Sequence, residues 1–325
     1  MPAILDYSQV AVSVIVQEVA ATSLATSLDE GLIRHMILNA VRAHVVRNRD
    51  YGEFVIACDG GFSWRRRMYP QYKCRRRRDE NRDDGINWTM LFDTVHDVRD
   101  ALKAHFPLKV IHVDGAEADD VIGVAVRRWA SEGKPVRIIS GDKDFQQLQR
   151  FSRVSQYSPT KRDPITKRNE EIVCADPVRF LGDHVLRGDS GDDVPNVVSD
   201  DLVFSDGRRQ NPVTEKMALD WHRYWSEDGI DDGFFAEYQA GKIWHSVAKK
   251  GIDVHELKRR VDRNINLIDL SRTPAELTAQ IEDALDNAEV ADLSETMMYL
   301  ASKGLDSLMG SVTDFVQPVN KFPVF

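Results

Sequence analysis

Short apolar runs that end on acidic residues recur through the first half of the chain. Runs with the length and composition of buried strands occupy residues 3–5, 54–58, 109–113 and 136–140. The segments between them carry helical patterns, at residues 32–47, 87–106 and 121–129. This alternation predicts parallel strands in an α/β domain. A carboxylate lies at or just beyond the end of every run, in the set Asp6, Asp59, Glu117, Asp119, Asp120, Asp142 and Asp144.

Parallel strands place their carboxyl ends at one edge of a sheet, so these acids are expected to converge there. Carboxylates that lie close together repel one another unless positive charge lies between them. A divalent metal is expected to supply that charge, because carboxylate and water oxygens suit magnesium or manganese. For an individual acid of this set, a purely structural role remains the alternative. An acid before a helix, such as Asp119, is commonly an N-cap, and Asp6 alone is commonly a turn residue.

A strongly basic segment follows the second run. From Trp64 to Arg82 nine Lys or Arg residues stand against two acids, inside a chain whose formal net charge is −9. Cations that follow phosphates and aromatics that stack on bases are the means by which proteins grip single-stranded nucleic acid. A solvated basic face or a localisation signal is the alternative. The candidate nucleic-acid contacts are Trp64, Arg65, Arg66, Tyr72, Lys73, Arg75, Arg76, Arg77 and Arg78.

The second half of the chain adds one more acidic turn and then changes character. A helix is expected at 176–186, with Asp176 as its N-cap. Asp189 and Asp192, three residues apart in the turn that follows, are expected to complete the metal cluster, whereas Asp183 and Asp193 are expected to be surface acids. The chain is helical in pattern from about residue 213. The expected domains are therefore 1–187, with a basic arch at about 62–88, and 188–325, a smaller all-helical domain.

Composition sets further limits. A hydrophobic content of 42% over 325 residues is enough for a substantial core in about two domains. Cys58, Cys74 and Cys174 lack metal-ligand spacing and are interpreted as free thiols of a protein in the reducing cytoplasm. No apolar run approaches ~18 residues, so no membrane span is expected. The tail at 316–325 either packs back on the body or docks a partner.

Several of these motifs together resemble the structure-specific 5′ nucleases, or flap endonucleases. The resemblance covers most of the chain, and its most specific part is Glu-Ala-Asp-Asp followed by Gly-Asp-Lys-Asp-Phe. Its segments lie at 4–11, 64–66, 72–77, 117–120, 140–145, 156–159, 187–193 and 266–270. It implies a PIN-like domain with a central, mostly parallel sheet and a helical arch, plus a helical domain that binds duplex. Residues 196–201 lack the glycine-rich turn through which many relatives bind duplex backbone, often with a potassium ion.

The resemblance also implies an activity: metal-dependent 5′→3′ exonuclease and flap endonuclease cleavage of RNA primers and adjacent DNA paired to DNA, in lagging-strand replication. It implies that all nine acids are ligands of two Mg²⁺ ions and that Mn²⁺ can replace Mg²⁺. Lys73 and Arg76 become the residues that reach the scissile phosphate, and Tyr72 the base-stacking residue. Implied partners are RNA–DNA hybrid, duplex and flap DNA, with a sliding clamp or single-strand-binding protein, for a monomeric enzyme. The alternatives are a PIN-type ribonuclease for single-stranded RNA and a non-catalytic protein that binds branched DNA.

Overall fold

A computed structural model describes residues 1–22, 28–75 and 87–316, and the chain forms two compact units. The first, which we call the sheet unit, comprises Met1–Phe62, Asp83–Val173 and Pro274–Phe325. The second, the helical unit, comprises Ser63–Arg82 and Cys174–Thr273. Both units are therefore assembled from separate stretches of the chain.

The sheet unit is built on six strands in the order β3-β2-β1-β4-β5-β6. Their bounds are β1 Pro2–Asp6, β2 Glu53–Cys58, β3 Lys109–His112, β4 Val136–Ile139, β5 Val154–Arg162 and β6 Asn169–Ile172. The first five run parallel, and only β6 is antiparallel. The strand order reverses at β1, which pairs Leu5 with Ile56 on one side and with Ile139 on the other. The expected α/β class with a mostly parallel sheet is thus confirmed.

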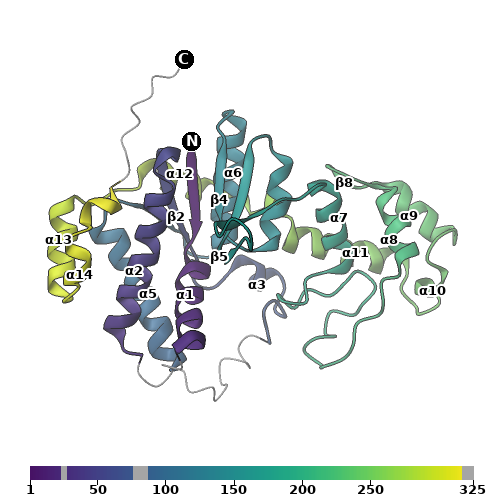
Figure 1. Ribbon diagram of the computed structural model, residues 1–325. Coiled ribbons are helices and arrows are strands. Elements are labelled where there is room, and N and C mark those ends of the chain that lie inside the picture. Colours follow the sequence, from purple (N-terminus) through teal and green to yellow (C-terminus); the bar gives the residue numbers. More distant parts are fainter. Residues whose placement is uncertain (23–27, 76–86, 317–325) are drawn as a thin grey trace. The chain divides into compact units, whose positions relative to one another are not determined.

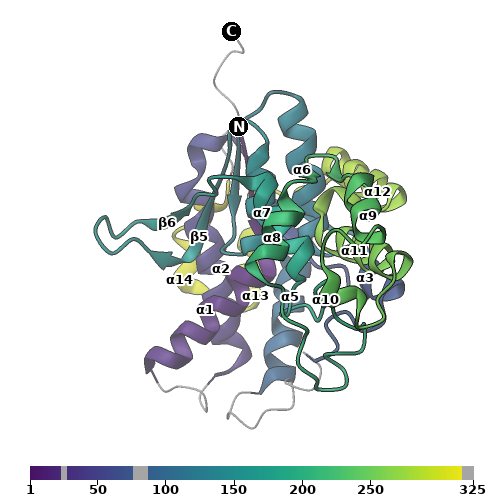
Figure 2. The ribbon, with the colours of Figure 1, turned by 90° about the vertical axis from the view of Figure 1, so that its right-hand side faces the viewer.

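Helices cover both faces of this sheet because its central strands are apolar on both (Figures 1 and 2). One face lies under α1 (Tyr7–Thr22), α2 (Glu30–Arg47) and α5 (Trp88–His105), and the other under α6 (Ala118–Ser131) and α12 (Ala275–Asn287). Leu5 and Ile56 belong to the core of the first face, and Ile4, the residue before Leu5 on β1, points the other way. The unit is completed by α13 (Leu293–Ser302), α14 (Asp306–Met309), η1 (Arg49–Tyr51), η2 (Lys143–Arg150) and η4 (Val312–Phe315).

The helical unit packs around Trp221, which is fully buried. Its helices are α3 (Trp64–Met68), α7 (Pro177–Arg187), α8 (Glu215–His222), α9 (Asp232–Gln239), α10 (His245–Ala248), α11 (Val254–Ile268) and η3 (Leu270–Arg272). The Trp221 ring lies against Phe234, Trp225 and Trp244, and its indole nitrogen donates to Gly182 O at 3.0 Å. Among its described residues, this unit also contains a short hairpin of two-residue strands, β7 (Trp225–Ser226) with β8 (Gly229–Ile230).

The bounds of the two units differ from the expected division at residue 188. Residues 174–187 belong to the helical unit, because Leu181, Val185 and Leu186 of α7 are buried in its core. Residues 274–315 return to the sheet unit, where Phe315 packs edge-on against Phe106 at 4.9 Å between ring centroids. The helix α1, directly after β1, was not expected from the pattern. In the part of the chain that the structure describes, none of the helices combines the length and apolar character needed to cross a bilayer.

Candidate active site

Seven of the nine predicted ligands belong to the sheet unit, and all seven lie at or after the carboxyl ends of its parallel strands. Their burial is graded. Asp6, Glu117 and Asp120 are buried, whereas Asp59 is exposed. Asp119, Asp142 and Asp144 are intermediate. The point where the strand order reverses, between β1 and β4, is where open parallel sheets place their sites.

Asp6 is the last residue of the central strand and is 7% exposed. Its carboxylate accepts hydrogen bonds from Gln9 N at 3.2 Å and from Ser140 Oγ, at the end of β4, at 3.0 Å. Burial, reinforced by the charges of Asp59 and Asp142, raises the pKa of Asp6 to about 7. The carboxylates of three separate strand ends therefore act on one another, as the sequence pattern predicts.

Asp59 is held by the first turns of α1 and α6. It accepts from Ser8 Oγ at 2.6 Å and from the backbone nitrogen of Ala118, at the start of α6, at 2.9 Å. The next residue, Gly60, hydrogen-bonds Ala116 O, and a Cβ there would lie 1.8 Å from Val113 O. Glycine at residue 60 thus permits close contact between the loops that follow β2 and β3, and this contact brings Asp59 to α6.

The acids at the start of α6 divide into two roles. Glu117 is the N-cap, and Asp120 completes a capping box by accepting from Glu117 N at 2.9 Å. The cap is therefore not Asp119, which lies in the first turn and is half-buried. Capping orients the side chains of Glu117 and Asp120, and it leaves Asp119 as the member of this motif that the cap does not engage.

Asp142 and Asp144 follow β4. Asp142 is the N-cap of η2, and its Oδ1 accepts from Asp144 N at 2.9 Å. Gln9 holds the preceding turn, because its side-chain oxygen accepts from Gly141 N at 2.5 Å and from Ser140 Oγ at 3.2 Å. One polar residue of α1 thus ties the end of β4 to the end of β1. Sequence reasoning did not single out Gln9 or Ser140, since neither belongs to a residue class that the acidic pattern selects.

The residues of this edge fit a divalent cation. Within the described residues, Asp6, Asp59 and Asp142 form no ion pair with Lys, Arg or His. With its pKa raised to about 7, Asp6 is partly protonated at neutral pH, which relieves part of the repulsion, and a hard cation bound by carboxylate oxygens would relieve the rest. Carboxylate oxygens, the donors at this edge, are the ligand type that suits magnesium or manganese.

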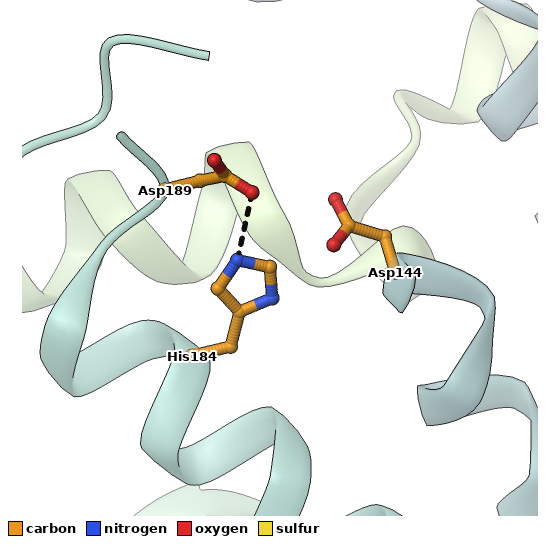
Figure 3. A group of neighbouring side chains, drawn as sticks. All are labelled: Asp144, His184 and Asp189. Carbon is orange, nitrogen blue, oxygen red and sulfur yellow. Dashed lines mark hydrogen bonds and ion pairs between the residues drawn. The ribbon is translucent and has the colours of Figure 1, made fainter. Parts of the chain in front are cut away.

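Asp189 and Asp192 belong to the helical unit, in the turn after α7. Asp189 is buried and accepts from Gly191 N at 2.7 Å and from His184 Nε2 at 2.9 Å (Figure 3). His184, a buried residue of α7, was missed by sequence reasoning because a lone histidine on an amphipathic helix gives no signal. The hydrogen bond fixes the orientation of the Asp189 carboxylate. Its assignment as a metal ligand stays a prediction.

Asp192 is joined to the first part of the basic segment. Its Oδ2 accepts from the Tyr72 hydroxyl at 2.8 Å and lies 3.6 Å from Lys73 Nζ. The ammonium of Lys73 also lies 4.8 Å from the centre of the Tyr72 ring. Tyr72 is 3% exposed, so base stacking by this residue requires its ring to leave the core of the helical unit.

Two further residues of the basic segment have structural partners in the helical unit. Arg65 is 2% exposed, and its Nε donates to Leu267 O at 2.9 Å. Arg75 pairs with Asp193 and stacks over the Phe204 ring at 4.4 Å. The expectation that Asp193 is a surface acid is wrong, because this residue is 1% exposed and holds Arg75.

The other predicted nucleic-acid contacts divide between α3 and the rest of the segment. Trp64 and Arg66 lie on α3 and are both half-buried. Arg76, Arg77 and Arg78 lie outside the described residues. The predicted role of Arg76 at the scissile phosphate therefore stays a prediction.

Comparison with known proteins agrees with the fold. Residues 19–175 match the family described as 5′-3′ exonuclease, N-terminal resolvase-like domain. Ribonuclease H of Enterobacteria phage T4 is 27% identical over 325 residues, which cover 96% of this chain and 95% of that protein. Over residues 19–175 the chain belongs to this 5′ nuclease family.

Other 5′ nucleases match parts of the chain or its fold. A flap endonuclease Xni of Shewanella sp. (strain MR-4) is 31% identical over 148 residues, which span 44% of this chain and about half (51%) of that protein. The flap endonuclease of bacteriophage T5, in a pseudo-enzyme–product complex with DNA and metal ions, shares the fold, with a TM-score of 0.59 at 15% identity over 97% of this chain and 98% of that one. A zinc-bound T5 5′-exonuclease has a TM-score of 0.58 at 18% identity over 89% and 100%. As a 5′ nuclease, the chain is an enzyme of a metal-dependent family that hydrolyses phosphodiester bonds.

Proposed function

We propose that this 5′ nuclease is a 5′→3′ exonuclease and flap endonuclease that removes RNA primers and adjacent DNA from strands paired to DNA during lagging-strand replication. The observation that carries the proposal is the convergence of carboxylates from β1, β2 and β4, with Asp6 at the centre of a parallel sheet and its pKa raised to about 7. T4 ribonuclease H, alike over nearly the full length of both chains, supports the RNA-directed part.

The acidic edge would hold Mg²⁺ through carboxylates of the sheet unit, with Mn²⁺ as a substitute. Two such ions would supply an activated water and neutralise the leaving oxygen. The protein's own contribution is position. Gln9 and Ser140 fix Asp6 against the end of β4, and the loop contact at Gly60 fixes Asp59 against α6. Ligands that are already oriented pay little reorganisation when charge develops in the reaction.

The remaining predicted ligands and the basic segment complete the proposal. Asp189 is oriented by His184, and the pair of Asp189 and Asp192 is proposed as further ligands. Lys73 and Arg76 are proposed to stabilise charge on the scissile phosphate, while Trp64, Arg66 and the rest of the basic segment guide the strand. Asp192 keeps the Lys73 ammonium in place until phosphate competes for it.

The proposed substrates are RNA–DNA hybrid, duplex and flap DNA, and the bacteriophage T5 flap endonuclease bound to DNA supports this class. A monomeric enzyme in the cytoplasm, with a sliding clamp or single-strand-binding protein as partner, is the proposed setting. The tail at 316–325 is the proposed docking segment, and residues 317–325 lie outside the described part of the chain.

The test is cleavage of a 5′-labelled RNA–DNA chimeric flap with and without magnesium, read as product length. The proposal predicts metal-dependent release of short products from the 5′ end and cleavage near the junction. Cleavage of free single-stranded RNA at a similar rate would instead favour a PIN-type ribonuclease. Binding of the flap without any cleavage would favour a branched-DNA binding protein.

A further inference from the structure

A second charged feature of the sheet unit lies away from the acidic edge. A cavity of about 450 Å³ is lined by residues of α2, η1, β4, β5, β6 and the β5–β6 loop. Figure 2 shows β5 and β6 at the border of the sheet, with their connecting loop extending outward. A volume of this size is in the range of pockets that hold a small molecule such as a nucleotide (~300–1,000 Å³).

The cavity is not part of the acidic edge. Its lining includes none of the nine predicted ligands: Asn48 and Tyr51 precede β2, Arg137 is the second residue of β4, and Tyr157 and Arg162 lie further along β5. Asp142 follows the opposite end of β4, five residues further along, which is up to ~16 Å in an extended chain. A ligand in the cavity therefore meets a separate set of side chains.

The lining is strongly basic in an acidic protein. It holds one carboxylate, Glu171, and five cations, a formal charge of +4 where the whole chain carries −9. The five cations are Arg47, Arg137, Arg162, Lys167 and Arg168. Only Arg137 has a carboxylate partner among the described residues. It pairs with Glu171 and stacks over the Tyr157 ring at 4.7 Å.

Arg47 and Arg162 share an unusual acceptor. Both donate to Oδ1 of Asn169, a buried and uncharged amide, and Arg162 does so at 2.9 Å. The amide is itself held rigidly, because its nitrogen donates to Ser158 O at 2.7 Å and to Pro159 O at 2.9 Å. Two guanidinium groups are thus gathered at one point, and neither has a carboxylate partner among the described residues. Their donors match the oxygens of a phosphate, which arginine binds in a fork.

Hydrogen bonds also hold the polar groups at the floor of the cavity in place. Tyr157 is buried, and its hydroxyl lies 2.9 Å from His44 Nδ1 and accepts from Asn48 Nδ2 at 3.0 Å. Burial and the charges of Arg47 and Arg162 lower the pKa of His44 to about 3, so this floor stays uncharged while the rim stays positive. The half-buried ring of Tyr51 offers an aromatic surface beside the cations.

We propose that this cavity is a second anion site, which binds the phosphate group of a nucleotide through Arg47 and Arg162. Two sources supply that chemistry: a phosphate in the backbone of bound nucleic acid, and a free nucleotide. The first rests on the proposed nuclease function and gives the enzyme a contact with nucleic acid outside the acidic edge. The second is independent of it, so the two sources are separable by experiment.

The test compares the full-length protein with Arg47→Gln/Arg162→Gln, in which glutamine keeps a donor for Asn169 and removes both charges. The matched control is Lys103→Gln/Lys303→Gln, the same charge change at exposed positions of the sheet unit outside the cavity. One probe is adenosine 5′-monophosphate, with inorganic phosphate beside it, measured by calorimetry in EDTA. The other is a labelled flap DNA, measured by anisotropy in calcium over a range of salt.

The proposal predicts that the arginine variant binds at least one probe about tenfold more weakly, whereas the control changes little. If nucleic acid is the source, the slope of log affinity against log salt becomes less steep by roughly one per lost phosphate contact. If a free nucleotide is the source, monophosphate binding falls and that slope stays constant. A Glu171→Gln variant, which removes the only carboxylate of the lining, is expected to change affinity in the opposite direction. Unchanged binding of both probes, or an equal loss in the lysine control, would overturn the proposal.

Discussion

Burial shifts the pKa values of two side chains of the sheet unit, Asp6 and His44, in the direction that favours their uncharged forms. Burial raises the pKa of Asp6 to about 7 and lowers that of His44 to about 3, because a low dielectric disfavours the charged form of each. Asp6 lies among other carboxylates, so a bound cation restores its charge. His44 lies beneath Tyr157 beside two arginines, so no proton is favourable there.

Because the pKa of His44 is lowered in the folded protein, the free energy of unfolding decreases at acidic pH. The unfolded histidine takes up a proton near pH 6.5, whereas the folded one does so near 3, so stability is lost as pH falls through this interval. By pH 4.5 the loss reaches about 3 kcal/mol. Urea unfolding from pH 7.5 to 4 should therefore show a shallower decline for His44→Gln than for the wild type. The same decline in both proteins would contradict the assignment, and His96→Gln, at an exposed position, is the control.

Lys73 is singled out from its basic neighbours because its proposed role is chemical. An interaction that strengthens only as charge builds on the phosphate raises the rate more than the affinity. Lys73→Ala should then lower single-turnover cleavage by roughly 10²–10³-fold, the loss that follows removal of one oxyanion donor. Arg67→Ala, exposed on α3, is the control and should act mainly through binding. Small and equal rate effects would make Lys73 an ordinary member of the basic patch.

At the scale of elements, the sequence predicts the strands and the acids at their ends because both signals are local. Apolar runs of three to five residues become β1 to β4, and the acid at or after the end of each run is visible in the sequence without knowledge of distant contacts. The capping box at Glu117 and Asp120 is equally local, although the sequence alone had left Asp119 open as the cap. Gln9, Ser140 and His184 were missed, since their roles depend on residues far away in the chain or on the folded turn.

The close contact between the loops after β2 and β3 requires a glycine at residue 60, and this requirement can be tested. In Gly60→Ala the new methyl would lie 1.8 Å from Val113 O, so the two loops must separate and carry Asp59 away from α6. We expect a loss of stability on the order of 1–3 kcal/mol and weaker metal-dependent cleavage. The control is Gly310→Ala, where nothing lies within 4 Å of the added carbon. Full activity and stability in Gly60→Ala would show that this approach does not position Asp59.

At the scale of the whole molecule, the expected division at residue 188 differs from the two units because the chain leaves the sheet unit and returns to it. The helical pattern from residue 213 onward is continuous, and nothing local marks Pro274 as the point of return. What decides the assignment is the packing of residues 299–315 on Phe106, α2 and α5, a tertiary contact that periodicity does not encode.

That return predicts a long-range effect on stability. Phe315 is fully buried in the sheet unit although it lies more than 150 residues beyond β5. Phe315→Ala should cost about 3–5 kcal/mol and lower the thermal midpoint of the sheet unit. Met298→Ala, on the neighbouring α13 but 64% exposed, should change little. Equal and small effects of both would contradict the assignment of this segment to the core.

The central claim is that the acidic edge of the sheet unit binds the metal ions on which cleavage depends. The most direct measurement is single-turnover cleavage of the chimeric flap in magnesium by Asp142→Asn, with binding measured in calcium. The control is Asp93→Asn, at an exposed position on α5. We expect a rate lower by roughly a hundredfold or more with binding intact or tighter, because one ligand and one repelling charge are removed together. Cleavage by Asp142→Asn within about tenfold of wild type would contradict it.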